Sequence, residues 1–174
     1  MKVTQLSIFA ENKPGHILAP CRLLADNGVD IRALSLADTQ RFGILRLIVS
    51  GWQAAANLLE EAGFLVRATE VVAVVVPDHP GGLVRVLSAF DGTPINIEYM
   101  YAFPFAREER AVLIFRFDDP DAAIERLRAA GIAMAGPEEL FGAEAARECP
   151  SPIPSPSNWS APPGYGACSK KARS

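Results

Sequence analysis

The segment Asn12-Lys13-Pro14-Gly15 recurs as Asp78-His79-Pro80-Gly81, 66 positions later. The same register continues without a gap to Asp30-Ile31, which corresponds to Asn96-Ile97. In each copy a β-rich, apolar segment precedes the Pro-Gly pair and an apolar pattern with helical spacing follows it. A match that holds over this length indicates an internal repeat, and a repeat is the feature of a sequence that most constrains its fold.

The second half of each copy also matches. After a loop that is two residues longer in the second copy, Ile44–Val49 corresponds to Val112–Phe117, and Ala62-Gly63 corresponds to Ala130-Gly131. We therefore predict two modules, residues 1–69 and 70–136. Residues 137–174 would form a short helix and a disordered tail rich in Pro and Ser, because such a composition buries too little apolar surface to offset its ordering entropy.

Each module predicts the order β-α-β-β-α-β. Alternating and β-branched residues indicate strands, and apolar positions three and four apart indicate helices. In the first module the expected strands are Val3–Phe9, Asp30–Ala37, Gly43–Val49 and Phe64–Ala68, and the expected helices are 16–27 and 52–62. The fold class is α+β: two ferredoxin-like modules, each an antiparallel sheet with helices on one face.

Three local features refine this prediction. Pro20 falls inside the first expected helix, where it would remove a backbone hydrogen bond and kink the helix. The corresponding helix of the second module, within 82–92, is short. Phe64–Val76 is nearly continuous β-type sequence, so we expect no flexible linker between the modules.

Composition excludes several classes of protein. Apolar residues make up 49% and charged residues 21% of the 174-residue chain, which indicates a globular protein. The longest apolar run, Val71–Val76, is far shorter than the ~20 residues of a membrane-spanning helix. A net charge of −3 argues against nucleic-acid binding. The N-terminus does not resemble a signal peptide and the three cysteines suggest no disulfide framework, so we expect a cytoplasmic location.

The repeated loop offers a site for a small ligand. The first N–H groups of a helix have no partner within the helix and attract anions such as a carboxylate, and glycine lets a ligand approach the backbone. Side-chain oxygens of Asn12 and Asp78, and of Asp30 and Asn96, can accept hydrogen bonds from an ammonium group. Together these groups suggest a pocket for a free α-amino acid. The alternative is that the Pro-Gly pair simply starts a helix and the Asn or Asp caps it.

Other chemistries find little support. The only histidines, His16 and His79, are not equivalent in the repeat and have no neighbours at metal-ligand spacing. No nucleophile and base can be paired, and no nucleotide-binding loop is present. We therefore expect no catalytic residues, no metal and no cofactor.

The motifs around both Pro-Gly pairs resemble the ACT-domain pattern: Phe9–Gly15 with Asn27–Ile31, and Val76–Leu83 with Pro94–Ile97. Residues 1–136 as a whole resemble a stand-alone tandem ACT protein. The resemblance implies regulatory binding of amino acids between paired modules. In the similar regulatory domain of phosphoglycerate dehydrogenase, the positions of Asn12 and Asp30, and of Asp78 and Asn96, contact the effector. The ligand-binding residues expected on this basis are Asn12, Pro14, Gly15, His16, Ile17, Asp30, Ile31, Asp78, Pro80, Gly81, Gly82, Leu83, Asn96 and Ile97.

Three functional hypotheses follow. The first is a non-catalytic regulator of amino-acid metabolism that binds a free amino acid, with Tyr99, Tyr101 and Phe103 either as an aromatic wall of its pocket or as sheet packing. The second is a docking subunit of a biosynthetic enzyme without its own ligand, similar to the small subunit of acetolactate synthase. The third is an enzyme on the same fold, which the missing acid/base pair disfavours. Because edge strands tend to pair, we expect a homodimer.

Overall fold

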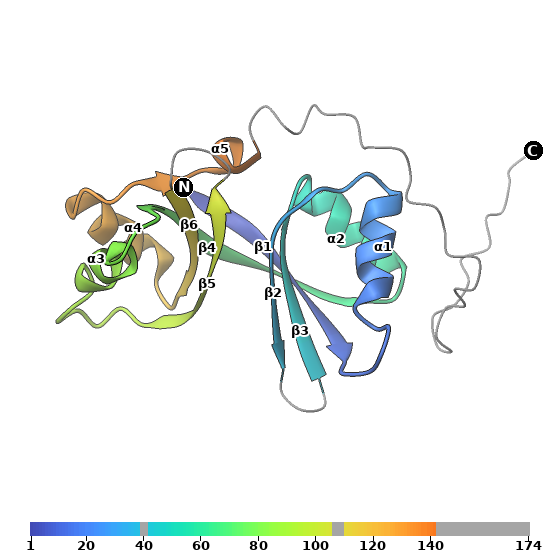
Figure 1. Ribbon diagram of the computed structural model, residues 1–174. Coiled ribbons are helices and arrows are strands. Elements are labelled where there is room, and N and C mark those ends of the chain that lie inside the picture. Colours follow the sequence, from blue (N-terminus) through green and yellow to red (C-terminus); the bar gives the residue numbers. More distant parts are fainter. Residues whose placement is uncertain (39–41, 106–109, 142–174) are drawn as a thin grey trace, which may run out of the picture. The chain divides into compact units, whose positions relative to one another are not determined.

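The computed structural model describes residues 1–38, 42–105 and 110–141. Its first elements are β1 (Lys2–Glu11), α1 (Leu18–Asp26), β2 (Ile31–Asp38), β3 (Phe42–Val49) and α2 (Trp52–Glu61). They are followed by β4 (Leu65–Pro77), α3 (Gly82–Ser88), β5 (Ile97–Phe105), β6 (Arg110–Phe117), α4 (Pro120–Ala129), β7 (Met134–Ala135) and α5 (Pro137–Phe141) (Figure 1). The predicted tail falls outside the described residues from position 142 onward. No helix within the described ranges is long and apolar enough to cross a membrane.

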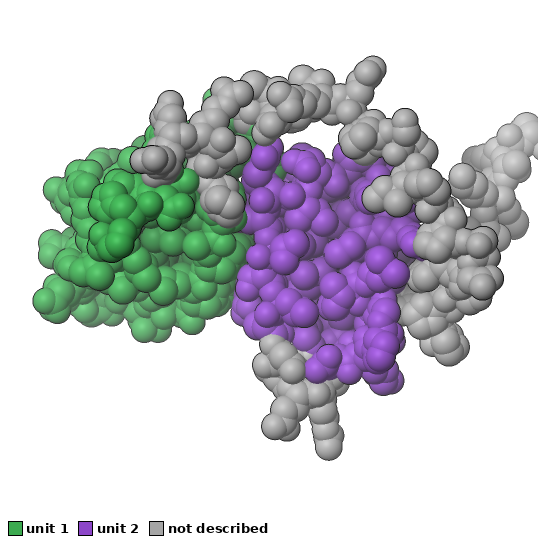
Figure 2. Space-filling view, viewed as in Figure 1, with its two compact units in different colours: residues 1–5, 69–144 green, residues 6–68, 145–174 purple. Residues whose placement is uncertain are grey.

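The chain divides into two compact units, which Figure 2 shows in green and purple. Unit 1 contains residues 1–5 and 69–144, and the described part of unit 2 lies within residues 6–68. Strands β1 and β4 each contribute residues to both units. The order β-α-β-β-α-β therefore occurs twice, as the repeat predicted, and the α+β fold class is confirmed.

In unit 2 the strand order is β2-β3-β1, and both pairings are antiparallel. Helices α1 and α2 lie together on one face of these strands (Figure 1). Alternate residues of β1 and β3, such as Leu6, Ile8 and Leu47, point toward the helices and are fully or almost fully buried. They meet Leu24 of α1 and Leu59 of α2, so both helices are held by apolar burial.

In unit 1 the strand order is β4-β6-β5, and the short strand β7 pairs with β4. The core on the helix side includes three stacked or tilted rings: Phe115 and Phe117 lie 5.5 Å apart between centroids, and Phe90 lies 4.8 Å from Phe117. Ile124 and Leu127 of α4 pack against the same cluster. The two units therefore have the same architecture, each with its own core.

Strand β4 explains the unbroken apolar run of the sequence. It is a single strand of 13 residues, and Val71–Val76 are all buried. Because successive strand residues point to opposite faces, burial of all six means that both faces of the strand are covered. No loop interrupts β4, as the continuous β-type sequence predicted.

The expected kink at Pro20 is wrong for a simple reason. Helix α1 begins at Leu18, not at residue 16, so Pro20 lies in its first turn. Backbone N–H groups there have no partner within the helix, and proline therefore costs no helical hydrogen bond. The predicted shortness of the corresponding second helix is confirmed, because α3 covers only seven residues, Gly82–Ser88.

Candidate functional site

The loop between β1 and α1 has a defined backbone conformation. The N–H of Lys13 donates to the carbonyl oxygen of Glu11 at 2.8 Å, and the N–H of His16 donates to that of Lys13 at 3.2 Å. Gly15 has φ +84°, a value that favours glycine. The conformation of the loop thus comes from its own backbone and from one glycine.

The loop between β4 and α3 repeats this conformation at the 66-residue offset. The N–H of His79 donates to the carbonyl oxygen of Pro77 at 3.0 Å, and the N–H of Gly82 donates to that of His79 at 3.1 Å. Gly81, which corresponds to Gly15, has φ +98°. Gly82 is required by close approach, since a Cβ atom there would lie 2.6 Å from the carbonyl oxygen of Pro77. The two copies of the repeat therefore share the backbone conformation of the loop as well as its sequence.

The structure does not support helix capping as the role of the loop side chains. The N-cap residue of α1 is Ile17 and that of α3 is Gly81, and neither helix start receives a side-chain cap. Asn12 and Asp78 are both exposed. Their polar side chains are therefore placed at the surface beside the loop and not on the first turn of a helix.

The residues that precede β2 and β5 are held in the same way in both modules. The N–H of Asp30 donates to Oγ of Ser50 at 3.1 Å, and the N–H of Asn96 donates to Oδ1 of Asp118 at 2.9 Å. In return, the N–H groups of Ser50 and Asp118 donate to the carbonyl oxygens of Asp30 and Asn96, respectively, at 3.0 and 3.2 Å. Both backbones are fixed by these bonds. The side chains of Asp30 and Asn96 remain exposed, with the Asp30 carboxylate 3.6 Å from the guanidinium of Arg32.

Within one module, the loop and the start of the second strand lie at opposite ends of the sheet. Glu11, at the end of β1, pairs with Phe42, whereas Ile31, at the start of β2, pairs with Val49. These partners are the two ends of β3, about 23 Å apart at ~3.3 Å per residue. The second module shows the same separation along β6. The structure therefore places Asn12 near Gly15 but far from Asp30. A pocket that uses the loop residues together with Asp30 or Asn96 needs a second module.

The remaining predicted residues divide between surface and core. Pro14, Pro80 and Leu83 are exposed, whereas His16 and Ile17 are half-buried. Ile31 and Ile97 pack against the cores of their respective modules. Nδ1 of His79 lies 3.0 Å from the carbonyl oxygen of Pro80, within its own loop. No cluster of metal-ligating side chains is found among residues 1–38, 42–105 and 110–141.

Sequence reasoning missed a buried amide that organises the aromatic strand β5. Gln5 is fully buried; its Nε2 donates to the hydroxyl of Tyr99 at 2.9 Å, and the hydroxyl of Tyr101 donates to its Oε1 at 3.0 Å. Both tyrosines are half-buried. Their polar ends are thus tied to β1, which supports a packing role for at least these two aromatic residues.

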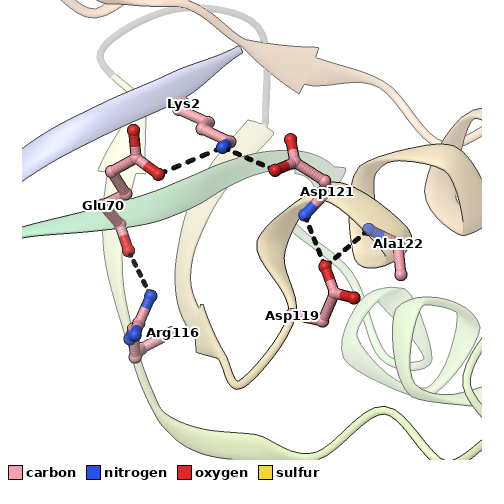
Figure 3. Close-up of polar contacts among 6 residues, drawn as sticks. All are labelled: Lys2, Glu70, Arg116, Asp119, Asp121 and Ala122. Atoms are coloured by element: carbon pink, nitrogen blue, oxygen red, sulfur yellow. Dashed lines mark hydrogen bonds and ion pairs between the residues drawn. The ribbon is translucent and has the colours of Figure 1, made fainter.

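A polar network joins the start of β1 to the second module (Figure 3). Nζ of Lys2 lies 3.0 Å from the Glu70 carboxylate and 2.9 Å from the Asp121 carboxylate. The hydrogen bonds that the Lys2 ammonium group donates to these carboxylates, to Asp121 first, raise the pKa of Lys2 above its ordinary value. Arg116 donates from Nη1 to the carbonyl oxygen of Glu70 at 3.1 Å. The network fastens the N-terminal residues within unit 1.

Asp119 caps helix α4. Its Oδ1 accepts hydrogen bonds from the N–H groups of Asp121 and Ala122 at 3.1 and 3.0 Å, and Pro120 occupies the first helical position. Asp119 therefore has the capping role that was the alternative for Asn12 and Asp78, a role that no side chain has at the starts of α1, α2 and α3. Elsewhere, burial raises the pKa of the Cys21 thiol, which packs against the core of unit 2.

Comparison with known proteins identifies the family of the chain. The family model of the ACT domain pair matches residues 1–140. The crystal structure of protein BT0572 from Bacteroides thetaiotaomicron has 34% sequence identity to this chain and a TM-score of 0.76, over 82% of this chain and 97% of that one. No curated protein matches the chain. The chain belongs to the ACT domain pair family, as its motifs indicated.

Two further solved structures share the fold at lower identity. The regulatory subunit of aspartate kinase from Thermus thermophilus, in ligand-free form, is 20% identical with a TM-score of 0.52, over 73% of this chain and 91% of that one. The corresponding subunit from Thermus flavus is 20% identical with a TM-score of 0.51, over 74% and 90%. The resemblance to tandem ACT proteins and the predicted fold are thereby confirmed.

Proposed function

We propose that this protein is a non-catalytic regulator that binds a free amino acid through its repeated loops. The observation that carries the proposal is the loop conformation, which is the same in both modules down to individual backbone hydrogen bonds. In the first module this loop leads into α1, whose first turn has no side-chain cap, and Asn12 is exposed beside it. In that turn the N–H of Leu18 already donates to the carbonyl oxygen of Gly15, and Pro20 has no N–H, so the N–H of Ala19 is the donor that a ligand carboxylate would use.

The ligand's ammonium group needs acceptors, and the exposed oxygens of Asp30 and Asn96 supply them. Because these residues lie at the far end of the sheet from the loop of their own module, the acceptors must come from a second module. We propose that a homodimer brings such modules together. Strand β2 is an edge strand in unit 2, and it exposes 59% of Leu34 and 55% of Leu36, an apolar edge suited to pairing.

Regulation requires that the amino acid bind two states of the protein, or of a partner enzyme complex, with different affinity. Cytoplasmic amino-acid metabolism is the setting we propose, and we propose neither metal nor cofactor. An alternative is a docking subunit of a biosynthetic enzyme without a ligand of its own. The fold shared with regulatory subunits of aspartate kinase is compatible with it, but fold alone does not determine function.

Two-dimensional NMR of the full chain, with each of the twenty amino acids added in turn, tests the proposal. We expect one chemical class of amino acid to shift the amide signals of residues 12–17 or 78–83 together with those of Asp30 or Asn96. Asn12→Ala should weaken binding, whereas Asn57→Ala, the same substitution on an exposed position of α2, should not. Shifts confined to other residues would reject the site, and a flat response to all twenty would favour the docking subunit.

A further inference from the structure

The end of helix α1 carries the one Asn-Gly dipeptide of the sequence, Asn27-Gly28. Asn27 is the C-cap residue of α1, and both residues are exposed. An asparagine that precedes glycine loses its side-chain amide more readily than other asparagines, because glycine has no side chain to hinder attack by its own backbone nitrogen. The chemistry of this helix end therefore depends on how the two reacting groups are held.

In the structure, each reacting group is held by a hydrogen bond of its own. The N–H of Gly28 donates to the carbonyl oxygen of Ala25 at 3.0 Å. Nδ2 of Asn27 donates to the carbonyl oxygen of Leu23 at 2.8 Å. Attack of the Gly28 nitrogen on the Asn27 side chain requires that both bonds break. The closed helix end thus protects the dipeptide.

Helices α2 and α4 end in the same way without an asparagine. In all three helices, the N–H of a glycine and the N–H that follows it donate to carbonyl oxygens three and five residues earlier, the Schellman pattern. The glycines of α2 and α4 are Gly63 and Gly131, and each follows an alanine, Ala62 or Ala130. The backbone cap therefore forms without an amide side chain, and Asn27 adds a reactivity that the cap does not need.

The end of α1 is built to open locally. The helix has only nine residues, no side-chain cap at its start and no basic residue in its last turn. A helix this short depends on packing for its stability, and helix ends open at a lower free energy than the core. Opening of the last turn releases the N–H of Gly28 and the amide of Asn27 together.

We propose that Asn27 is a site of spontaneous deamidation, which reacts only when the end of α1 opens. In the open state the backbone nitrogen of Gly28 attacks Cγ of Asn27. The bond between Cγ and Nδ2 breaks, and Nδ2 leaves as ammonia with the proton of the Gly28 N–H. Water then hydrolyses the succinimide ring: cleavage at Cγ gives aspartate, and cleavage at the backbone carbonyl carbon gives isoaspartate.

Either product weakens the closed helix end. A carboxylate at position 27 has no proton to donate to the carbonyl oxygen of Leu23, and its charge lies at the negative end of α1. Isoaspartate also lengthens the backbone of the cap. The new negative charge lies three residues before Asp30. The modification therefore changes the charge near an expected ligand-binding residue, but the proposal does not depend on a ligand.

Incubation of the full-length protein at neutral pH, followed by peptide mapping with mass spectrometry, tests the proposal. The peptide that contains Asn27 should gain the mass difference between an amide and an acid, and should separate into aspartate and isoaspartate forms. Asn57, which is exposed but precedes leucine, should react far more slowly. In urea, where the helix end is always open, Asn27 should react at least about tenfold faster than in the folded protein, which corresponds to an opening free energy of about 1.4 kcal/mol or more.

A pair of matched variants tests the control by α1. Ala25→Gly, at an exposed position in the last turn of α1, should raise the rate in the folded protein about fivefold, the fold-change that corresponds to the ~1 kcal/mol by which glycine weakens a helix. The rate in urea should not change. Ala54→Gly makes the same substitution at an exposed position of α2 and should leave both rates unchanged.

Three results would overturn the proposal: equal rates at Asn27 in the folded and the unfolded protein, a folded protein in which Asn27 reacts no faster than Asn57, and equal rates in the Ala25→Gly and Ala54→Gly variants. Circular dichroism confirms that each variant is folded. Asn27→Ala gives α1 the Ala-Gly end of α2 and α4, so it should fold and lose the mass change. None of these readouts involves an amino-acid ligand, so this proposal and the proposed function can fail separately.

Discussion

Asn96 and Asp118 hold each other by two hydrogen bonds: the N–H of Asn96 donates to the Asp118 carboxylate at 2.9 Å, and the N–H of Asp118 donates to the Asn96 carbonyl oxygen at 3.2 Å. Asp30 and Ser50 form the same pair of bonds in the first module. In each module, the start of the second strand is thus fixed by the residue that follows the third strand. These bonds involve only the backbone groups of Asp30 and Asn96. They position the exposed side chains of the two residues, which take no part in the bonds.

Asp118→Ala should destabilise the protein by about 1–2 kcal/mol. The Asp118 carboxylate also accepts from the N–H of Asp119 at 2.9 Å, so the substitution removes two hydrogen bonds of about 0.5–1.5 kcal/mol each, partly replaced by water. Asp118→Asn keeps an acceptor oxygen and should lose less. Urea unfolding of both variants measures the difference. Equal losses for the two substitutions would contradict the role given to the acceptor.

Gly82→Ala should cost about 1–3 kcal/mol, the range for forcing atoms into a packed site. The new Cβ would lie 2.6 Å from the carbonyl oxygen of Pro77, which already accepts the N–H of His79. Alanine favours a helix by about 1 kcal/mol over glycine, so the clash must exceed this gain to be seen. At Gly136 an added Cβ meets no atom within 4 Å, and Gly136→Ala should change the unfolding free energy by less than about 0.5 kcal/mol. Similar unfolding midpoints for the two variants would rule out the close approach.

Asp119→Ala should destabilise helix α4 by about 0.5–2 kcal/mol, the usual loss when an N-cap side chain is removed. The carboxylate accepts from the N–H groups of Asp121 and Ala122, and no other side chain caps this helix. Asparagine at the same position retains the cap and should restore most of the loss. Thermal unfolding followed by circular dichroism compares the three proteins. If the asparagine variant has the same Tm as the alanine variant, removal of the cap does not explain the loss of stability.

The Lys2 ammonium group should titrate above its ordinary pKa, because Asp121 and Glu70 accept hydrogen bonds from its charged form. A raised folded-state pKa means that the stabilisation is fully present below the unfolded-state value and is lost as the pH rises through the folded-state value. NMR titration of the lysine side-chain carbons measures this directly. Asp121→Asn should move the midpoint back toward the value of an exposed lysine. An unchanged Lys2 midpoint in that variant would show that Asp121 is not the main cause.

The fold was predictable because the sequence carries the same signal twice. The Pro-Gly loop, the β-rich segments and the later Ala-Gly pair recur in register, and each copy constrains the other. Boundaries were less certain: α1 starts two residues later than expected, because the loop continues through His16 with its own backbone bonds. That shift removed the expected kink at Pro20.

The candidate site was only partly predictable. The sequence suggested one pocket for Asn12 and Asp30 between paired modules, but it did not show that antiparallel pairing with β3 places the two residues of one module at opposite ends of that strand. Gln5 gave no signal at all, since a glutamine in an alternating strand usually faces solvent, and its partner Tyr99 is 94 positions away.

The most direct measurement is a thermal-shift screen of the full-length protein against the twenty amino acids. A ligand at 100 times its Kd adds about 2.7 kcal/mol to the free energy of unfolding. For a chain of this length, that corresponds to a rise in Tm of roughly 5–10 °C. The account predicts such a rise for one chemical class of amino acid, and its loss in a protein that carries both Asn12→Ala and Asp78→Ala. No rise with any amino acid, or a rise that survives the double substitution, would contradict it.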